Sequence, residues 1–133
     1  MAWTFFEFIS KSRKSYYRTW LNSLPVPAQP KIEARIKYVQ AMSRIERPEW
    51  ARLGGSGKGL LEIRVKGPAR VQYRPIGCDD SQMLDGLHNT NRIFLLGGAI
   101  EKDRKFQPPD AVTTNQKRKQ DLIATNRFIE YGS

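Results

Sequence analysis

The chain has 133 residues, 39% of them apolar and 11% aromatic, which suits one folded domain over residues 1–133 and is too apolar for a disordered segment. It contains one cysteine and one histidine, which excludes an internal disulfide framework and zinc sites built from several such residues. The net charge is +10 and is spread along the chain, which favours a polyanionic partner such as nucleic acid over a membrane surface. With no run of about 20 apolar residues and no leader-like start, we expect a cytoplasmic protein.

The first third of the chain predicts a strand followed by two helices. Residues 2–9 are rich in aromatic side chains and read as a short strand. Residues 10–24 show helical spacing, with Ser10 as the expected N-cap and Pro25 after the end. Residues 30–46 form a second amphipathic pattern, whose inner stripe holds Ile32, Ile36 and Val39. Because the connection is short, we expect an antiparallel helical hairpin.

The middle of the chain predicts an antiparallel sheet. Residues 60–66 and 69–76 alternate between apolar and polar side chains around a Gly-Pro turn, which favours a hairpin. Residues 92–100 read as a buried strand, in which Gly97-Gly98 indicates a bulge or a close backbone approach. A helix is expected over residues 110–129. The Gly-rich segment 54–59 is interpreted as a mobile connector, because Gly follows its Lys where a phosphate-binding loop needs Ser or Thr.

The predicted hairpin places several cations on its non-core side. Like charges held on neighbouring strands repel one another, and a bound anion would relieve that repulsion. We therefore expect Arg64, Arg70 and Arg74 to form a concave, electropositive floor for a phosphate, although a solvated face neutralised by Glu62 is the alternative. The cationic face consists of Arg64, Lys66, Arg70 and Arg74, together with the neutral Gln72.

The charged segment after the last predicted strand extends this candidate site. Lys102, Arg104 and Lys105 would position phosphates, and Phe106 or Tyr73 could stack on an unpaired base. Phe106 could equally fill the core, and strict alternation favours the core for Tyr73. His88 lies in a polar loop, where it is either solvated or a general acid or base, and Cys78 is expected to be a small buried residue.

Three segments carry a resemblance to a known family. The first joins WLNSLP (20–25) to KIEARIKYV (31–39), the second is GLLEIRVK (59–66), and the third runs from ARVQYRP (69–75) to RIFLLGGAIEKDRKFQPP (92–109). In order and spacing they resemble the RelE/ParE superfamily of toxins from bacterial toxin–antitoxin systems, closest to the HigB-like, phage-type branch.

The resemblance implies an α+β fold: two N-terminal helices on a curved, mainly antiparallel four-stranded sheet, with a C-terminal helix. It also implies a ribosome-dependent messenger RNA endoribonuclease that needs no metal or other cofactor. The substrate's 2′-hydroxyl would attack the adjacent phosphorus and leave a cyclic phosphate. The expected partners are messenger RNA, the ribosome and an antitoxin protein that is acidic or of helix-turn-helix type.

The candidate site follows from this chemistry. Fixed cations would stabilise charge on the phosphorus oxygens, and a lysine or Tyr73 would take the 2′-hydroxyl proton. The catalytic candidates are Arg64, Arg70, Tyr73, Arg74, Lys102 and Lys105, and the RNA-binding candidates are Lys66, Arg104 and Phe106.

The chain also departs from the family pattern. Leu61 replaces an aromatic residue, Glu101 stands where a basic residue is usual, and the loop 77–91 is longer and more acidic. Two alternatives therefore stay open: a ParE-like toxin that binds a protein target such as DNA gyrase, and a phage-derived RNA-binding protein without catalysis.

Overall fold

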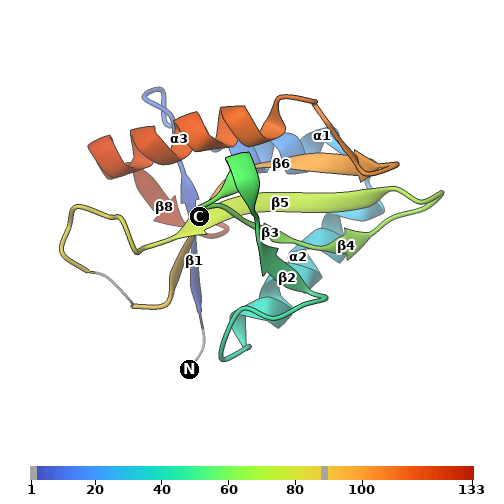
Figure 1. Ribbon diagram of the computed structural model, residues 1–133, viewed down its shortest axis with the longest axis horizontal. Coiled ribbons are helices and arrows are strands. Elements are labelled where there is room, and N and C mark those ends of the chain that lie inside the picture. Colours follow the sequence, from blue (N-terminus) through green and yellow to red (C-terminus); the bar gives the residue numbers. More distant parts are fainter. Residues whose placement is uncertain (1–2, 88–89) are drawn as a thin grey trace.

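A computed structural model describes residues 3–87 and 90–133. Within these residues the protein is α+β, with a mixed sheet and helices on both of its faces (Figure 1). The helices are α1 (Tyr16–Ser23), α2 (Ala28–Gln40) and α3 (Ala111–Thr125), with a 3-10 turn η1 (Gly55–Gly57). The strands are β1 (Thr4–Phe8), β2 (Trp50–Arg52), β3 (Leu61–Ile63), β4 (Val65–Lys66), β5 (Gln72–Asp79), β6 (Arg92–Lys102), β7 (Lys105–Gln107) and β8 (Phe128–Glu130).

The sheet corrects the fold expected from the sequence. The described strands form an eight-stranded sheet in the order β2-β3-β5-β6-β1-β8, with β4 beside β5 and β7 beside β6. Strand β1 runs parallel to β6, and the other pairs are antiparallel. The predicted fold, in which two N-terminal helices and a C-terminal helix pack on a four-stranded, mainly antiparallel sheet, is therefore wrong, because the sheet has eight strands and is mixed. Strands of three residues are too short to show alternation, and the parallel pairing leaves no mark in local sequence.

Both N-terminal helices are shorter than expected. Helix α1 begins at Tyr16, because the Ser15 side chain accepts a hydrogen bond from the Arg18 amide at 3.0 Å. Ser10, the predicted cap, instead lies in the turn before the helix, where its amide donates to the carbonyl of Lys14. Helix α2 ends at Gln40 rather than near residue 46. Its predicted inner stripe is confirmed, since Ile32, Ile36 and Val39 are all buried.

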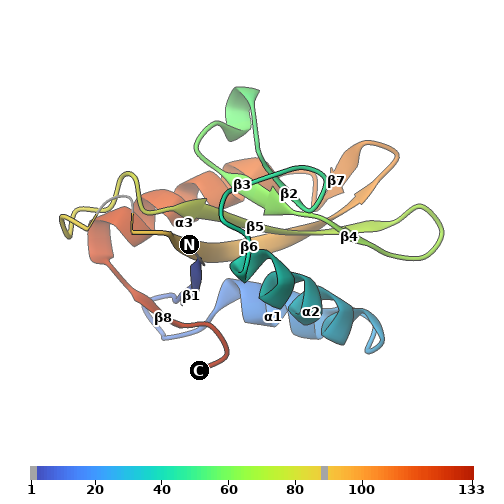
Figure 2. The same cartoon turned by 90° about the horizontal axis from the view of Figure 1, so that it is seen from below.

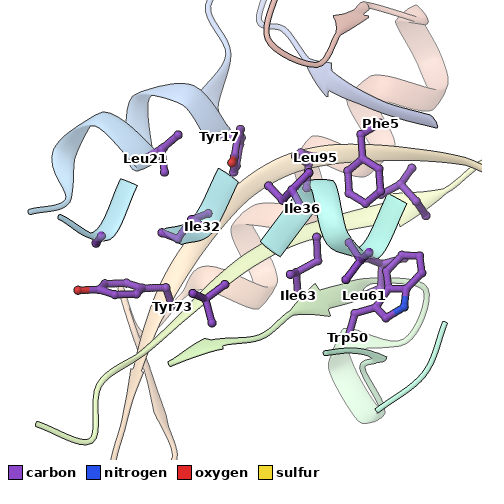
Figure 3. Packing of buried hydrophobic residues seen from close by; sticks show 14 of the residues in the cluster. Phe5, Tyr17, Leu21, Ile32, Ile36, Trp50, Leu61, Ile63, Tyr73 and Leu95 are labelled. Carbon is purple, nitrogen blue, oxygen red and sulfur yellow. The ribbon is translucent and has the colours of Figure 1, made fainter. Parts of the chain in front are cut away.

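Apolar side chains cover both faces of the sheet. One face packs against α1 and α2, and Figure 3 shows Tyr17, Leu21, Ile32 and Ile36 of these helices facing Tyr73 and other sheet residues. The other face packs against α3, and Figure 2 shows α3 on the opposite side of the sheet from α1 and α2. A sheet buried on both faces needs strands that are apolar throughout, which explains why β5 and β6 are buried over most of their length.

The close backbone approach predicted at Gly97-Gly98 is confirmed. A Cβ atom on Gly98 would lie under 3.0 Å from the Trp20 ring of α1. A Cβ atom on Gly97 would lie equally close to Arg118 and Asn115 of α3. The two glycines therefore let helices on opposite faces contact the backbone of the same strand.

The Gly-rich segment 54–59, expected as a mobile connector, is hydrogen-bonded to α3. The Gln116 side-chain amide donates to the carbonyls of Ser56 and Lys58, at 3.0 and 2.9 Å. The Lys119 ammonium donates to the carbonyl of Gly59 at 3.3 Å. Helix α3 thus anchors this segment through its side chains.

Candidate functional site

The strand register assigns the predicted site residues to two faces of the sheet. Gln72 pairs with Lys66 and with Glu101, and Glu101 pairs with Phe106, so these side chains share the face that carries α3. Alternation adds Arg74, two residues from Gln72, to the same face. The cationic side of the predicted hairpin therefore exists, on the same face of the sheet as α3.

Carboxylates alternate with arginines along this face. The Arg64 Nε donates to Glu62 Oε2 at 2.9 Å, and the Arg74 Nε lies 3.7 Å from Glu62 Oε1. The Arg74 Nε also donates to Glu101 Oε1 at 3.1 Å, and its Nη2 donates to the same oxygen. We call this set the charged row, and it consists of Arg64, Glu62, Arg74 and Glu101.

The expected uncompensated cationic floor is therefore wrong. Two of its three arginines, Arg64 and Arg74, are paired with carboxylates. The third, Arg70, lies in the exposed turn before β5, with a backbone φ of 66°. The pairing has a simple cause, because Glu62 alternates in phase with Arg64 and Glu101 lies on the neighbouring strand from Arg74.

Burial divides the charged row into an inner and an outer pair. The side chains of Arg74 and Glu62 are 7% and 6% exposed, whereas those of Arg64 and Glu101 are 26% and 27% exposed. The Arg74 Nη1 is buried and has no hydrogen-bond partner among the described residues. A ligand on this surface would thus contact Arg64 and Glu101, while Arg74 and Glu62 hold them in place.

Three of the predicted catalytic residues lie on the opposite face. Tyr73 is buried in the core below α1 and α2 (Figure 3), so its ring is not available to stack on a base. Lys102 and Lys105 pair across β6 and β7 and are exposed. Because Glu101 and Phe106 share the face of the charged row, these two lysines project from the other side of the same hairpin.

The remaining candidates lie at or beside the tips of two hairpins. Arg70 is in the β4–β5 turn, and Arg104, with a φ of 65°, is in the β6–β7 turn. Both tips project from the same end of the sheet in Figures 1 and 2. Phe106 is half-buried against the α3-side core, next to Glu101. The candidate His88 lies outside the described residues.

The alternative in which Glu62 neutralises the arginines is the one that the ion pairs fit. The residue that sequence reasoning misses is Glu101, which stands out there only as a departure from the family pattern. For Glu62 the signal is its alternation in phase with Arg64. Glu101 lies on a different strand from Arg74, so no local pattern indicates that pair. A carboxylate beside a guanidinium can accept a proton while the guanidinium stabilises an anion, so this face has the groups for acid–base chemistry on a phosphate.

Other features of the described residues complete the description of the site. In residues 3–87 and 90–133, no three His, Cys, Asp or Glu side chains converge as metal ligands would. No helix in the same ranges is long and apolar enough to cross a membrane. Comparison with protein-family models, with curated proteins and with solved structures finds no match.

Proposed function

We propose that the protein binds single-stranded RNA at the end of the sheet that carries the two hairpin tips, and cleaves it at the charged row. It would act as the toxin of a toxin–antitoxin system, of the kind that its sequence resembles. The observation that carries the proposal is an accessible carboxylate and an accessible guanidinium, Glu101 and Arg64, on a sheet whose neighbouring hairpins carry exposed cations without an ion-pair partner in residues 3–87 and 90–133.

The exposed cations account for binding. None of them forms an ion pair within the described part of the chain, so their charge is available to phosphates. Their position on two adjacent tips lets one RNA strand contact both (Figures 1 and 2). Phe106, half-buried beside Glu101, offers an aromatic surface to a base at the row. These cations are Lys66, Arg70, Lys102, Arg104 and Lys105.

The charged row accounts for cleavage. Both hydrogen bonds from Arg74 fall on Oε1 of Glu101, and Oε2 accepts none from the described residues. That oxygen takes the proton of a 2′-hydroxyl as O2′ bonds to the adjacent phosphorus and the bond to O5′ breaks. The leaving O5′ gains a proton from water, and the products are a 2′,3′-cyclic phosphate and a 5′-hydroxyl end. Arg64 stabilises the charge that develops on the phosphorus oxygens.

A second candidate is RNA binding without cleavage. The ion pairs of the row favour it, because a guanidinium that already binds a carboxylate has fewer donors left for a phosphate. The exposed cations at the hairpin tips would still bind RNA in that case.

Cleavage of an end-labelled messenger RNA in a translating extract tests the proposal. We expect the wild-type protein to cut RNA, to leave DNA of the same sequence intact, and to produce cyclic-phosphate ends. The E101Q variant should lose roughly 100-fold or more of the cleavage rate, and R64M a similar amount, with RNA binding nearly unchanged. Matched controls are E46Q and R44M, which remove an exposed pair elsewhere on the surface and should leave cleavage unchanged.

The outcomes separate the candidates. Cleavage that survives in both E101Q and R64M would contradict the assignment of the charged row. RNA that is bound in a salt-sensitive way and never cut by the wild-type protein would support the second candidate instead. Growth arrest with intact transcripts would contradict both and point to a protein target.

A further inference from the structure

A second feature lies apart from the charged row, at the edge of the sheet between α1 and α3. On the side of β6 away from β5, the strand pairs with β1 as far as Leu95 and with β7 from Ile100 onward. Among the described strands, residues 96–99 therefore have a neighbouring strand only on the β5 side. Side chains of α1 and α3 meet around this gap. They line a half-open cavity of about 240 Å³.

The cavity wall combines two aromatic rings, hydroxyl groups and one cation. Trp20 and Tyr16 of α1 line it, and the Gly98 backbone forms part of its floor. Because the Trp20 ring lies against that backbone, its position is fixed by the absence of a side chain at residue 98. Thr19 and Thr114 add hydroxyl groups from the two helices.

The cation is Arg118, and it has no carboxylate within ion-pair distance in the described part of the chain. Its guanidinium lies 4.0 Å from the centre of the Tyr16 ring. Its Nη1 donates at 3.3 Å to the Leu96 carbonyl and at 3.4 Å to the Asn115 side chain, both longer than a usual charged hydrogen bond. Burial lowers the pKa of Arg118, with Tyr16 and Asp110 acting in the other direction. A half-buried guanidinium with weak partners favours an anionic ligand.

The size of the cavity limits the ligand. Sites for whole small molecules usually span roughly 300–1,000 Å³, so this cavity suits one planar group of a longer molecule. Pro108, which also lines it, lies three residues after Lys105 of β7, or about 10 Å along an extended chain. Lys105 and Lys102 project on the side of β6 and β7 away from the charged row. A polyanion bound to these lysines could therefore reach the cavity.

We propose that this cavity binds one nucleotide of single-stranded RNA, with its base on Trp20 and its phosphate on Arg118. The choice of RNA rests on the proposed function, but binding at the cavity does not require cleavage. Aromatic rings with an adjacent arginine are the usual means of holding an unpaired base and its phosphate. An acidic side chain of a protein partner would satisfy Arg118 but would leave the Trp20 ring without a planar neighbour.

Titration with mononucleotides, followed by NMR of the tryptophan indole N–H groups, tests the inference. The probes are the four ribonucleoside 5′-monophosphates, uridine and inorganic phosphate, and W20F identifies the Trp20 signal. We expect the monophosphates to shift that signal, and uridine and phosphate to bind at least several-fold more weakly. The R118M variant should bind roughly tenfold or more weakly. K117M, which removes a neighbouring exposed cation on the same helix, is the matched control and should bind as the wild type does.

R118K keeps the charge without the planar guanidinium, so it should recover only part of the affinity even if R118M is poorly folded. Monophosphates that leave the Trp20 signal unmoved, or that bind R118M and K117M equally, would overturn the inference. A glutamate-rich peptide that displaces the nucleotide at equal concentration would assign the cavity to a protein instead. Nucleotide binding by a wild-type protein that cuts no RNA would support the cavity while the proposed cleavage fails, and cleavage without nucleotide binding would do the reverse.

Discussion

Replacement of Gly98 by alanine tests the packing that brings α1 onto β6. An alanine Cβ would lie under 3.0 Å from three atoms of the Trp20 ring, a separation that folded proteins do not tolerate. Either the indole or the strand must therefore move. Overpacking of this kind usually costs about 1–3 kcal/mol, and because Trp20 is only half-buried we expect a cost in the lower part of that range, about 1–2 kcal/mol.

Thermal and urea unfolding of four proteins would measure this cost: the wild type, G98A, W20A and the double variant. For a chain of this length, G98A should lower Tm by about 3–10 °C. In the W20A background the alanine has no ring to displace, so its cost should fall below about 0.5 kcal/mol. G54A is the control, because a Cβ at Gly54 meets no atom within 4 Å and its φ is −109°. An equal cost of G98A in both backgrounds would refute the assignment of the strain to Trp20.

Two further predictions concern buried titratable groups. Burial raises the pKa of Glu7, but hydrogen bonds from Arg18, the Gly132 amide and Ser15 outweigh it and leave the pKa below the ordinary value of 4.5. The ionised carboxylate therefore stabilises the fold, and the free energy of unfolding in urea should fall as the pH drops below about 4.5. This loss should be smaller in E7Q than in the wild type. An equal pH dependence of stability in the two proteins would contradict the prediction. Burial raises the pKa of the Cys78 thiol to about 12. The thiol should therefore react with a thiol reagent at least 100-fold more slowly in the native protein than in denaturant. Rapid labelling of the native protein would contradict the burial of Cys78.

Regular periodicity predicted the parts of the fold that have enough residues to show it. The stripe of Ile32, Ile36 and Val39 was visible because it spans two helical turns, and it is buried as expected. The end of α3 could also have been predicted more closely. Asn126 adopts a left-handed conformation and its amide donates to the Leu122 carbonyl, so the helix stops there and residues 128–130 become β8.

Long-range pairing set the limits of prediction. The position of β1 next to β6 depends on segments far apart in the chain, and no local pattern records it. The same holds for the candidate site. The sequence showed that Arg64 and Arg74 share a face, but it did not show that Glu101, on another strand, would bind Arg74. Charge balance on a sheet depends on lateral neighbours as much as on alternation within one strand.

The placement of β1 also has a consequence for the kinetics of folding. This strand lies near the start of the described chain, yet both of its neighbours, β6 and β8, come from the last third. The hairpin of β5 and β6 can form from nearby residues, whereas β1 must close a loop that spans most of the domain. We therefore expect refolding in milliseconds to seconds rather than microseconds, with docking of the first strand as the late step.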